Sequence, residues 1–362
     1  MKFGLSILDR YILKKFLGTF FFSIMLIILV VIVFDISEKI EDFVKPDITV
    51  QEIIFDYYLN FIPYFVNLYS YLFTFIAVIF FTARMASRSE IVAMLSSGLS
   101  FNRLLRPYFI GATIIFLTSL FLNTYLIPVA NKTRLNFMMK YIDNNFVYST
   151  RNIHRQVAQG TFVYMESYNN ESNTGSRFTI EKFNGRDLQF KLSAREIIWD
   201  SLTSRWSIID YSGRYIKQNK EHLIQGIKID TTLNLNPKDF SRAESRMESM
   251  TSGELNSFIE DEQTKGSDNV QLYEIEKYKR LAFPFATFIL TSIGVSVSSR
   301  KNRGGVGRHL GVGISLSFIF IFFMQWFMSY AATGVLPAYI AVWVPNGIFA
   351  LIAIYMLRKA PK

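Results

Sequence analysis

The chain has 362 residues, enough for two domains, and half of them are hydrophobic, including 35 Phe and 19 Tyr. This composition indicates a membrane protein, and the absence of cysteine excludes a disulfide framework, a thiol nucleophile and a Cys-ligated zinc site. The three His residues lie far apart in no metal-ligand spacing, so we expect no metal site and no cofactor.

Five uncharged runs define the expected membrane spans. The first four cover residues 16–34, 57–83, 107–131 and 281–299. The fifth, 309–357, holds 49 residues without Asp, Glu, Lys or Arg. Because one span needs about 20 apolar residues, this run divides into two spans near "ATGVLPA". The sequence therefore predicts six transmembrane helices. No small-residue cleavage site accompanies the first span, so we expect it to be retained.

The charges between the spans predict their orientation. The N-terminus, residues 84–106, residues 300–308 and the C-terminal tail together hold 15 Lys and Arg, against the acids Asp9 and Glu90. The loop 35–56 has seven acids and two lysines, Lys39 and Lys45. By the positive-inside rule, both termini are cytoplasmic and residues 35–56 and 132–280 face the other side. The net charge of +10 follows from this topology and implies no nucleic-acid partner.

The basic segment "FTARMASRSEIVAMLSSGLSFNRLLRP" between the second and third spans predicts a short amphipathic helix near residues 87–98. Ser87 and Glu90 have the spacing of a capping box, Gly98 suits a helix stop, and Ser100 suits the cap of the next helix. An apolar stripe follows the box: Ile91, Met94 and Leu95. Two roles stay open. The helix either rests on lipid with its arginines near headgroups, or couples the membrane part to a cytoplasmic ATPase.

Between the third and fourth spans, residues 145–235 alternate apolar and polar side chains between turn-forming segments. This pattern predicts an all-β domain, either a sandwich or an open barrel. A capping box at Thr251 and Glu254 then predicts a polar helix leading into the fourth span. The expected organisation is 1–131 for the first three spans, 132–250 for the β-domain, 251–280 for a helical connector and 281–362 for the last three spans.

Catalytic motifs are missing from the sequence. There is no G-x-x-x-x-G-K-[ST] motif for nucleotide phosphates. Asp and Glu are absent from the interiors of the predicted spans, which argues against a proton relay or an ion-coupled carrier. We therefore predict a protein that is not an enzyme and that takes energy for any transport from a partner.

Three segments carry a resemblance to a known family: "ILDRYILKKFL", "ASRSEIVAMLSSGLS" and "YEIEKYKRLAFPFATFILTSIGVSVSSRKNRGG". They resemble the LptF/LptG (YjgP/YjgQ) permease family, in particular its LptG branch. The resemblance implies the membrane part of an ABC transporter that extracts lipopolysaccharide from the inner membrane of Gram-negative bacteria and passes it to a periplasmic jellyroll bridge protein. It also implies six transmembrane helices with a periplasmic β-jellyroll, a second related permease subunit and a cytoplasmic ATPase dimer.

The resemblance assigns site residues in the short helix between the second and third spans and near the outer end of the first span. Glu90 corresponds to the coupling-helix carboxylate, and its motif neighbours complete the ATPase-coupling set: Arg88, Ser89, Met94 and Gly98. Lys39 corresponds to a basic position that the family uses near lipid phosphates. In this chain it is surrounded by acids, which weakens the expected phosphate pairing. Lys45 either contributes to phosphate binding or is an ordinary surface lysine.

The β-domain carries a second expected substrate region. We predict that Phe178, Ile180, Ile208 and Tyr215 point inward and contact acyl chains in a sandwich that stays open along one side. The alternative is a closed sandwich that only docks the bridge protein through a strand edge. For the whole chain, the alternative function is a membrane-anchored periplasmic receptor or scaffold that transports nothing.

Overall fold

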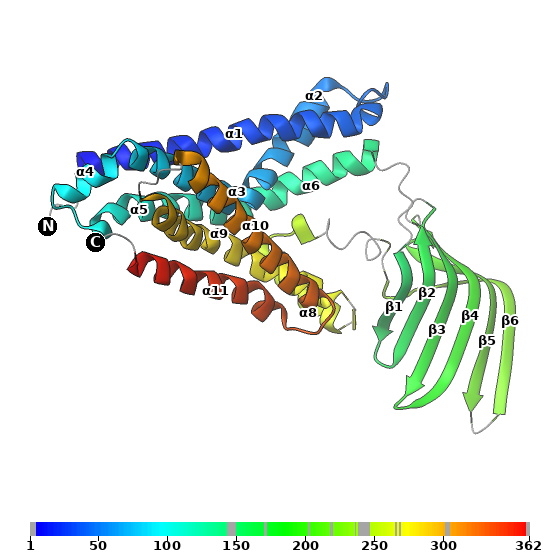
Figure 1. Ribbon diagram of the computed structural model, residues 1–362. Helices are drawn as coiled ribbons and strands as arrows, with labels where there is room; N and C mark the ends of the chain where they lie inside the picture. Colours follow the sequence, from blue (N-terminus) through cyan, green and yellow to red (C-terminus); the bar gives the residue numbers. More distant parts are fainter. Residues whose placement is uncertain are drawn as a thin grey trace. The chain divides into compact units, whose positions relative to one another are not determined.

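The computed structural model describes residues 5–142, 150–169, 172–201, 203–217, 220–235, 237, 247–264, 266–267, 269–300 and 305–359 (Figure 1). The chain forms two compact units. The helical unit comprises Met1–Met138 and Glu274–Lys362, and the β-containing unit comprises Met139–Tyr273. The β-containing unit is thus inserted into the sequence of the helical unit.

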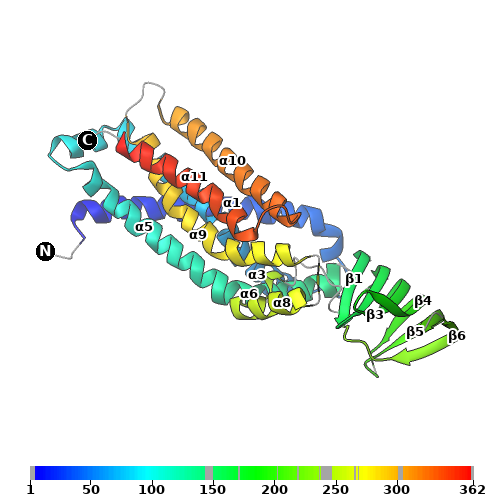
Figure 2. The same ribbon diagram turned by 90° about the horizontal axis from the view of Figure 1, so that it is seen from below.

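Six helical segments are long and apolar enough to cross a membrane, as the uncharged runs predicted. Their elements are α1 (Ile7–Phe43), α2 (Val50–Glu52), η1 (Ile53–Tyr58), α3 (Leu59–Ser87), α5 (Phe101–Phe121), η2 (Leu122–Leu126), α6 (Ile127–Phe137), η3 (Met138–Ile142), α9 (Val270–Ser298), α10 (Gly305–Ala332) and α11 (Ala338–Arg358). The short helix α4 (Glu90–Ser96) lies between the second and third segments. The start of α1 and the end of α11 lie at the end of the bundle where α4 lies (Figure 1). From below, α5, α9, α10 and α11 run in the same general direction (Figure 2).

Helix α1 contacts the rest of the bundle through a narrow stripe. Its buried apolar residues within the span are Ile12, Phe16, Phe20 and Ile24, each four positions after the last. Residues four apart lie on one face of an α-helix, so the stripe follows one line along α1. In contrast, α9 has buried residues at most positions between Ala282 and Ser299. Helix α9 is therefore a central helix and α1 a peripheral one.

A buried polar network joins α3, α5, η2 and α9. Asn67 donates to Asn123 Oδ1 at 2.6 Å and accepts from the Ser119 hydroxyl at 2.5 Å. Asn123 Nδ2 donates to the backbone carbonyl of Arg280 at 3.0 Å. Pro284 lies four residues further along α9 and has no N–H to bond this carbonyl. Asn123 thus donates the hydrogen bond to the Arg280 carbonyl that Pro284 cannot donate. A backbone carbonyl in apolar surroundings needs such a donor.

The β-containing unit holds one antiparallel sheet of six strands in the order β1-β2-β3-β4-β5-β6. The strands are β1 (Thr150–Ala158), β2 (Thr161–Asn169), β3 (Thr174–Asn184), β4 (Asp187–Asp200), β5 (Arg205–Lys217) and β6 (Lys220–Thr231), and α8 (Ser252–Thr264) follows them. The inserted all-β domain is confirmed. The described strands lie in a single sheet, because short hairpins place each strand beside the next one in sequence.

In β3 and β5 the backbone is irregular at the same level of the sheet, and in β3 the alternation of buried and exposed side chains shifts there by one residue. There Arg177 of β3 and Asp210 of β5 have φ values of 48° and 50°, which are uncommon for non-glycine residues. In β3 the buried positions pass from Gly175 to Phe178, three residues later, before the two-residue period resumes at Ile180. The shift by one residue keeps the buried side chains on the same face along the whole strand.

This buried face forms the core of the β-containing unit. Trp206, Tyr168 and Phe178 are fully buried there. The Trp206 indole donates to the Leu235 carbonyl at 3.0 Å, so residues after β6 cover this end of the face. Burial raises the pKa of the Tyr168 phenol above its usual value, and the group stays a hydrogen-bond donor to Asn173.

Helix α8 begins at the predicted capping box. Glu254 accepts hydrogen bonds from the Thr251 backbone N–H and hydroxyl, and its own N–H donates to the Thr251 hydroxyl at 3.3 Å. The same helix contributes Glu262, which forms a buried ion pair with Arg155 of β1. This part of the connector predicted for residues 251–280 is thus joined to the sheet.

Candidate functional site

Helix α4 begins at Glu90 after a sharp turn. Ser89 has a left-handed φ of 61° and separates α4 from α3, which continues to Ser87. The Ser87 hydroxyl donates to the Arg84 carbonyl at 2.9 Å and does not cap α4. The predicted capping box of Ser87 with Glu90 is therefore wrong, because Ser87 still belongs to α3 and the N-cap residue of α4 is Ser89, directly before Glu90.

The Glu90 carboxylate instead contacts α1. Its Oε2 accepts a hydrogen bond from the Tyr11 hydroxyl at 2.8 Å and lies 3.6 Å from Lys15 Nζ. The Lys15 ammonium also lies over the Tyr11 ring, 4.3 Å from its centroid. Tyr11 and Lys15 are four residues apart on one face of α1, so a single acid of α4 binds both.

The apolar stripe of α4 packs inward. Ile91 is 1% exposed and belongs to the same cluster as Ile12 and Phe16 of α1, with Met94 packed against it. The exposed side of α4 carries Val92, Ala93 and Ser96, and Arg88 is exposed just before the helix.

Gly98 ends α4 with a φ of 88°, as predicted for a helix stop. Its N–H donates to the Leu95 carbonyl at 3.0 Å, and the N–H of Leu99 donates to Met94 at 3.3 Å. The predicted cap of the next helix is also confirmed, since Ser100 accepts from the Arg103 N–H at 3.3 Å.

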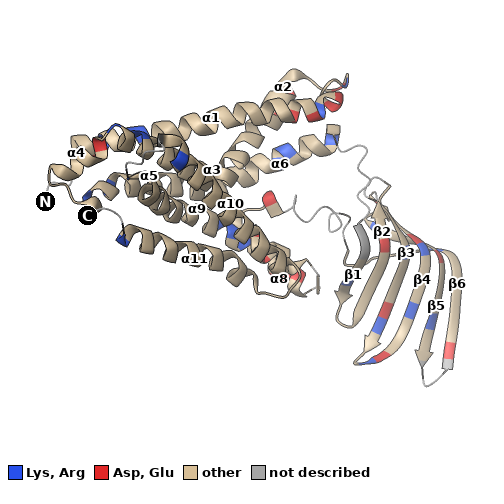
Figure 3. Cartoon of the chain, in the orientation of Figure 1, with Lys and Arg blue, Asp and Glu red and all other residues tan. Residues whose placement is uncertain are grey.

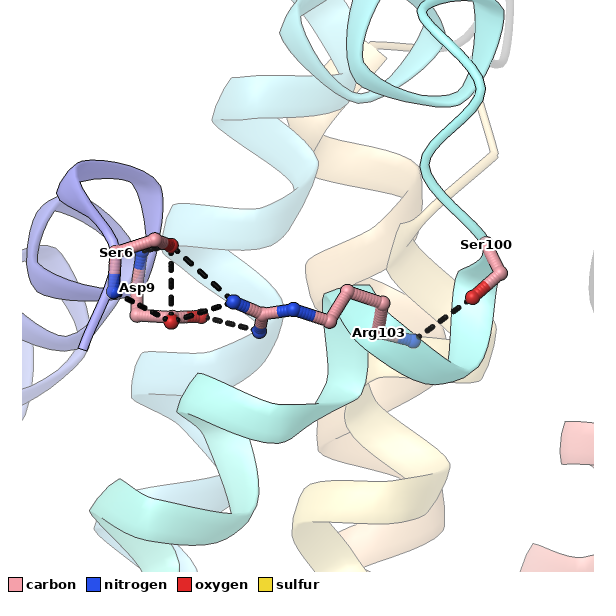
Figure 4. Close-up of polar contacts among 4 residues, drawn as sticks. All are labelled: Ser6, Asp9, Ser100 and Arg103. Atoms are coloured by element: carbon pink, nitrogen blue, oxygen red, sulfur yellow. Dashed lines mark hydrogen bonds and ion pairs between the residues drawn. The ribbon is translucent and has the colours of Figure 1, made fainter. Parts of the chain in front are cut away.

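A second polar cluster links the starts of α1 and α5 (Figure 4). Ser6 caps α1 and forms a capping box with Asp9. Both oxygens of Asp9 accept from the Arg103 guanidinium, Oδ1 from Nη1 at 2.6 Å and Oδ2 from Nη2 at 2.7 Å. Arg103 lies in the first turn of α5, so this bidentate pair joins two helix ends that are 94 residues apart in sequence.

A third cluster lies toward the other end of α1. Lys39 donates to Asp35 and to the Tyr57 hydroxyl. Asp35 also accepts from Tyr57 at 3.1 Å and from Tyr58 at 3.0 Å. The two tyrosines belong to η1, where the wider π-turn places consecutive hydroxyls on the two oxygens of one carboxylate.

Both lysines assigned to this end therefore bind acids of α1, Lys39 from within the helix and Lys45 from just after its end. The Lys39 side chain is only 19% exposed. Lys45 pairs with Asp42 at 2.6 Å. The expected weakening of phosphate pairing at Lys39 has a structural basis in Asp35. The sequence did not indicate Tyr57 and Tyr58, although two adjacent tyrosines beside an acidic segment are the signal that could have found them.

Three of the four assigned β-domain residues come together. Phe178, Ile180 and Ile208 are buried in one cluster, with exposed fractions of 0%, 7% and 3%. Tyr215 lies directly opposite Phe190 in the sheet, with tilted rings whose centroids are 4.5 Å apart, so it shares the face of the buried cluster. It is nevertheless 49% exposed, because this end of the face is not covered. The cover at Leu235 lies over Trp206, nine residues earlier in β5, so it does not extend over Tyr215.

Charge is distributed unevenly along the helical unit. Lys and Arg gather around α4 and the two chain termini, whereas the acids of α1 other than Asp9 lie at its opposite end (Figure 3). Among the described residues, no group of three or more His, Cys, Asp or Glu is arranged to hold a metal ion.

The six apolar helices, the short helix between the second and third of them, and the inserted all-β unit define a multi-pass membrane protein with an all-β insertion. The chain belongs to the lipopolysaccharide export system permease LptF/LptG family, whose model matches residues 10–359. No curated protein matches the chain. The family membership confirms the resemblance found in the sequence and makes the protein a multi-pass inner-membrane protein.

Proposed function

We propose that this protein is the permease subunit that extracts lipopolysaccharide from the inner membrane and passes it to a periplasmic bridge protein. The family match over residues 10–359 carries this proposal. It pairs with a second, related permease and takes the LptG-like role. A dimer of cytoplasmic ABC ATPase subunits supplies the energy, so this chain is non-catalytic. Both termini and α4 face the cytoplasm, in agreement with the basic residues around them (Figure 3).

In this proposal α4 is the coupling helix. The packing of Ile91 against α1 supports it, because a helix resting on lipid turns its apolar stripe toward acyl chains and not toward the protein. The opposite side, with Arg88 and Val92, is exposed and available for a groove on the ATPase. Glu90 lies between these sides, with a side chain 23% exposed.

Lys39 is the proposed contact for a lipid phosphate. A phosphate oxygen accepts from an ammonium and from tyrosine hydroxyls, as the Asp35 carboxylate does here. The phosphate therefore has to displace Asp35 from Lys39 and Tyr57. This competition predicts weaker binding than a lysine without an adjacent acid would give. Lys45 is a secondary contact, since Asp42 occupies it in the same way.

The β-containing unit is proposed to receive acyl chains on its apolar face. The cluster around Phe178, Ile180 and Ile208 supplies the apolar surface, and Tyr215 lies at its exposed margin. If the unit only docks the bridge protein through a strand edge, lipid will not contact these positions. Photocrosslinkers at Ile180 and Ile208 distinguish the two roles, because ATP-dependent lipopolysaccharide adducts form only if lipid passes over this face.

Purification of the complex from membranes tests the proposed function as a whole. The transporter retains an ABC ATPase and a second permease, and it releases lipopolysaccharide from proteoliposomes when ATP is added. A membrane-anchored receptor or scaffold retains neither ATPase activity nor ATP-dependent release. That second result would remove the transport function and leave a docking role for the β-containing unit.

A further inference from the structure

The ion pair between Asp9 and Arg103 is unusually well enclosed for the end of a helix bundle. The Asp9 side chain is 1% exposed, and Arg103 is 33% exposed. Besides the two guanidinium contacts, Asp9 Oδ2 accepts from the Ser6 backbone N–H and hydroxyl, both at 2.9 Å. Arg103 Nη2 also donates to the Ser6 hydroxyl at 3.2 Å. A fork-like guanidinium bound to both carboxylate oxygens fixes direction as well as distance (Figure 4).

Arg103 occupies a position that helix electrostatics alone disfavours. Ser100 is the N-cap of α5, so Arg103 lies in the first turn, where the helix dipole is positive and a cation is repelled. Asp9 lies in the first turn of α1, where an anion is favoured. The pair therefore places the anion of one helix start against the cation of another. This arrangement accounts for an arginine at a site where the helix itself prefers an acid.

The start of α1 contacts both α4 and the first turn of α5, which follows α4 in the chain. At the first residue of α4, Glu90 binds Tyr11 and Lys15. Just after the exit from α4, Arg103 binds Asp9. Between these contacts Ile91 is buried beside Ile12 and Phe16 of α1. A displacement of α4 thus acts on α1 directly through Glu90 and Ile91, and indirectly through the start of α5, where Arg103 binds Asp9.

Helix α1 can carry such a displacement toward its other end. It continues from Ile7 to Phe43 as one helix of 37 residues, a length of about 55 Å. Its apolar contacts with the bundle are the narrow stripe already described and, at the outer end, the packing of Phe43 against Tyr57 and Tyr58. The polar contacts at its two ends add to this packing. The far end carries Lys39, the proposed phosphate contact.

We propose that Asp9 and Arg103 are positioning residues that make α1 follow α4, so that movement of the coupling helix reaches the outer end of α1. The inference rests on the proposed function, because it assigns a route for the energy of ATP hydrolysis within the same permease. Tyr11 and Lys15 hold the second contact point of this route. Neither Asp9 nor Arg103 needs to touch substrate or nucleotide.

The test measures lipopolysaccharide released per ATP hydrolysed by the purified complex in proteoliposomes. Asp9→Asn and Arg103→Gln break the pair, and Arg103→Lys keeps the charge but loses the bidentate fork. We expect these variants to keep hydrolysing ATP, while the amount of lipopolysaccharide released per ATP falls about fivefold or more. A factor of about five is the lower end of the range for energetic coupling between linked sites. Arg106→Gln is the matched control, since it removes an exposed cation from the same helix, and it should keep the wild-type ratio.

A covalent crosslink between positions 9 and 103 distinguishes a positioning role of the ion pair from a purely stabilising one. The chain has no native cysteine, so Asp9→Cys with Arg103→Cys gives one addressable pair in a complex whose other subunits lack reactive thiols. A flexible bifunctional thiol reagent should restore the ratio, and a monofunctional reagent should not. The proposal is overturned if complete crosslinking restores nothing, or if all three pair-breaking variants keep the wild-type ratio. Failure of wild-type release would instead refute the proposed function.

Discussion

Breaking the buried ion pair between Arg155 of β1 and Glu262 of α8 should strongly destabilise the β-containing unit, because it leaves one charge buried without its partner. The two side chains are 9% and 1% exposed, and Nη1 lies 2.5 Å from Oε2. Replacing Glu262 with Leu leaves the guanidinium buried without this carboxylate. Breaking a buried pair in this way costs about 3–5 kcal/mol of the free energy of unfolding. Replacing both partners, Arg155→Met with Glu262→Leu, should return stability close to the wild-type value.

The unit contains a matched control for this prediction. Arg177 and Glu166 pair at 2.9 Å, but their side chains are 79% and 42% exposed. Glu166→Leu should therefore cost less than about 1 kcal/mol, because water screens both charges before and after the change. The two pairs have the same chemistry and similar distances. Burial alone accounts for the difference in expected cost.

Thermal unfolding of the full chain, followed by tryptophan fluorescence, measures this difference. Trp199 and Trp206 lie in the sheet, and the other two tryptophans, Trp326 and Trp343, are replaced with Phe so that the signal reports the sheet. A loss of 3–5 kcal/mol should lower the midpoint by about 10–20 °C for a unit of this size. A decrease no larger than that of Glu166→Leu would refute the reasoning from burial.

Three further predictions concern the helical unit and the orientation of the chain. Glu90→Ala removes partly exposed contacts to Tyr11 and Lys15, so it should lower the free energy of unfolding by only about 1 kcal/mol and yet abolish ATP-driven transport. Full transport by this variant would favour the alternative that α4 rests on lipid. Gly111→Ala should destabilise the bundle by about 1–3 kcal/mol in thermal unfolding, because its Cβ would lie 2.4 Å from a Phe16 ring carbon. Gly18→Ala is the control and should not destabilise the bundle, because a Cβ there would have nothing within 4 Å. A single cysteine at the exposed Arg186 should react with an impermeant thiol reagent in cells with a permeabilised outer membrane, and reaction only after lysis would contradict the proposed orientation.

The spans could be predicted from the sequence because charges delimit them so clearly. The ends of the helices could not be predicted in this way, because a charged residue marks the end of the apolar span but does not end the helix. The acidic segment after Asp35 continues α1 to Phe43, and Lys39 and Asp35 face one another on it as i and i+4 residues. The sequence located these charges correctly but did not show that they neutralise each other.

The site was predicted in part for a similar reason. Glu90 was identified from its motif, but its partner Tyr11 is 79 residues away, and no local spacing indicates that contact. In the sheet, the alternation predicted the strands, whereas the shift of that alternation by one residue occurs where Arg177 and Asp210 have positive φ values. Aspartate tolerates that conformation but arginine rarely adopts it, so the local sequence did not indicate the shift.

The most direct test of the central claim is ATP-dependent release of lipopolysaccharide from proteoliposomes that contain the purified complex. The proposed function predicts that the chain purifies with an ABC ATPase and that added ATP, but not a non-hydrolysable analogue, drives release to a periplasmic acceptor. It also predicts that Glu90→Ala abolishes release while the complex stays assembled. A wild-type complex that binds no ATPase, or that releases no lipopolysaccharide with ATP, would contradict the assignment of this chain as a transport permease.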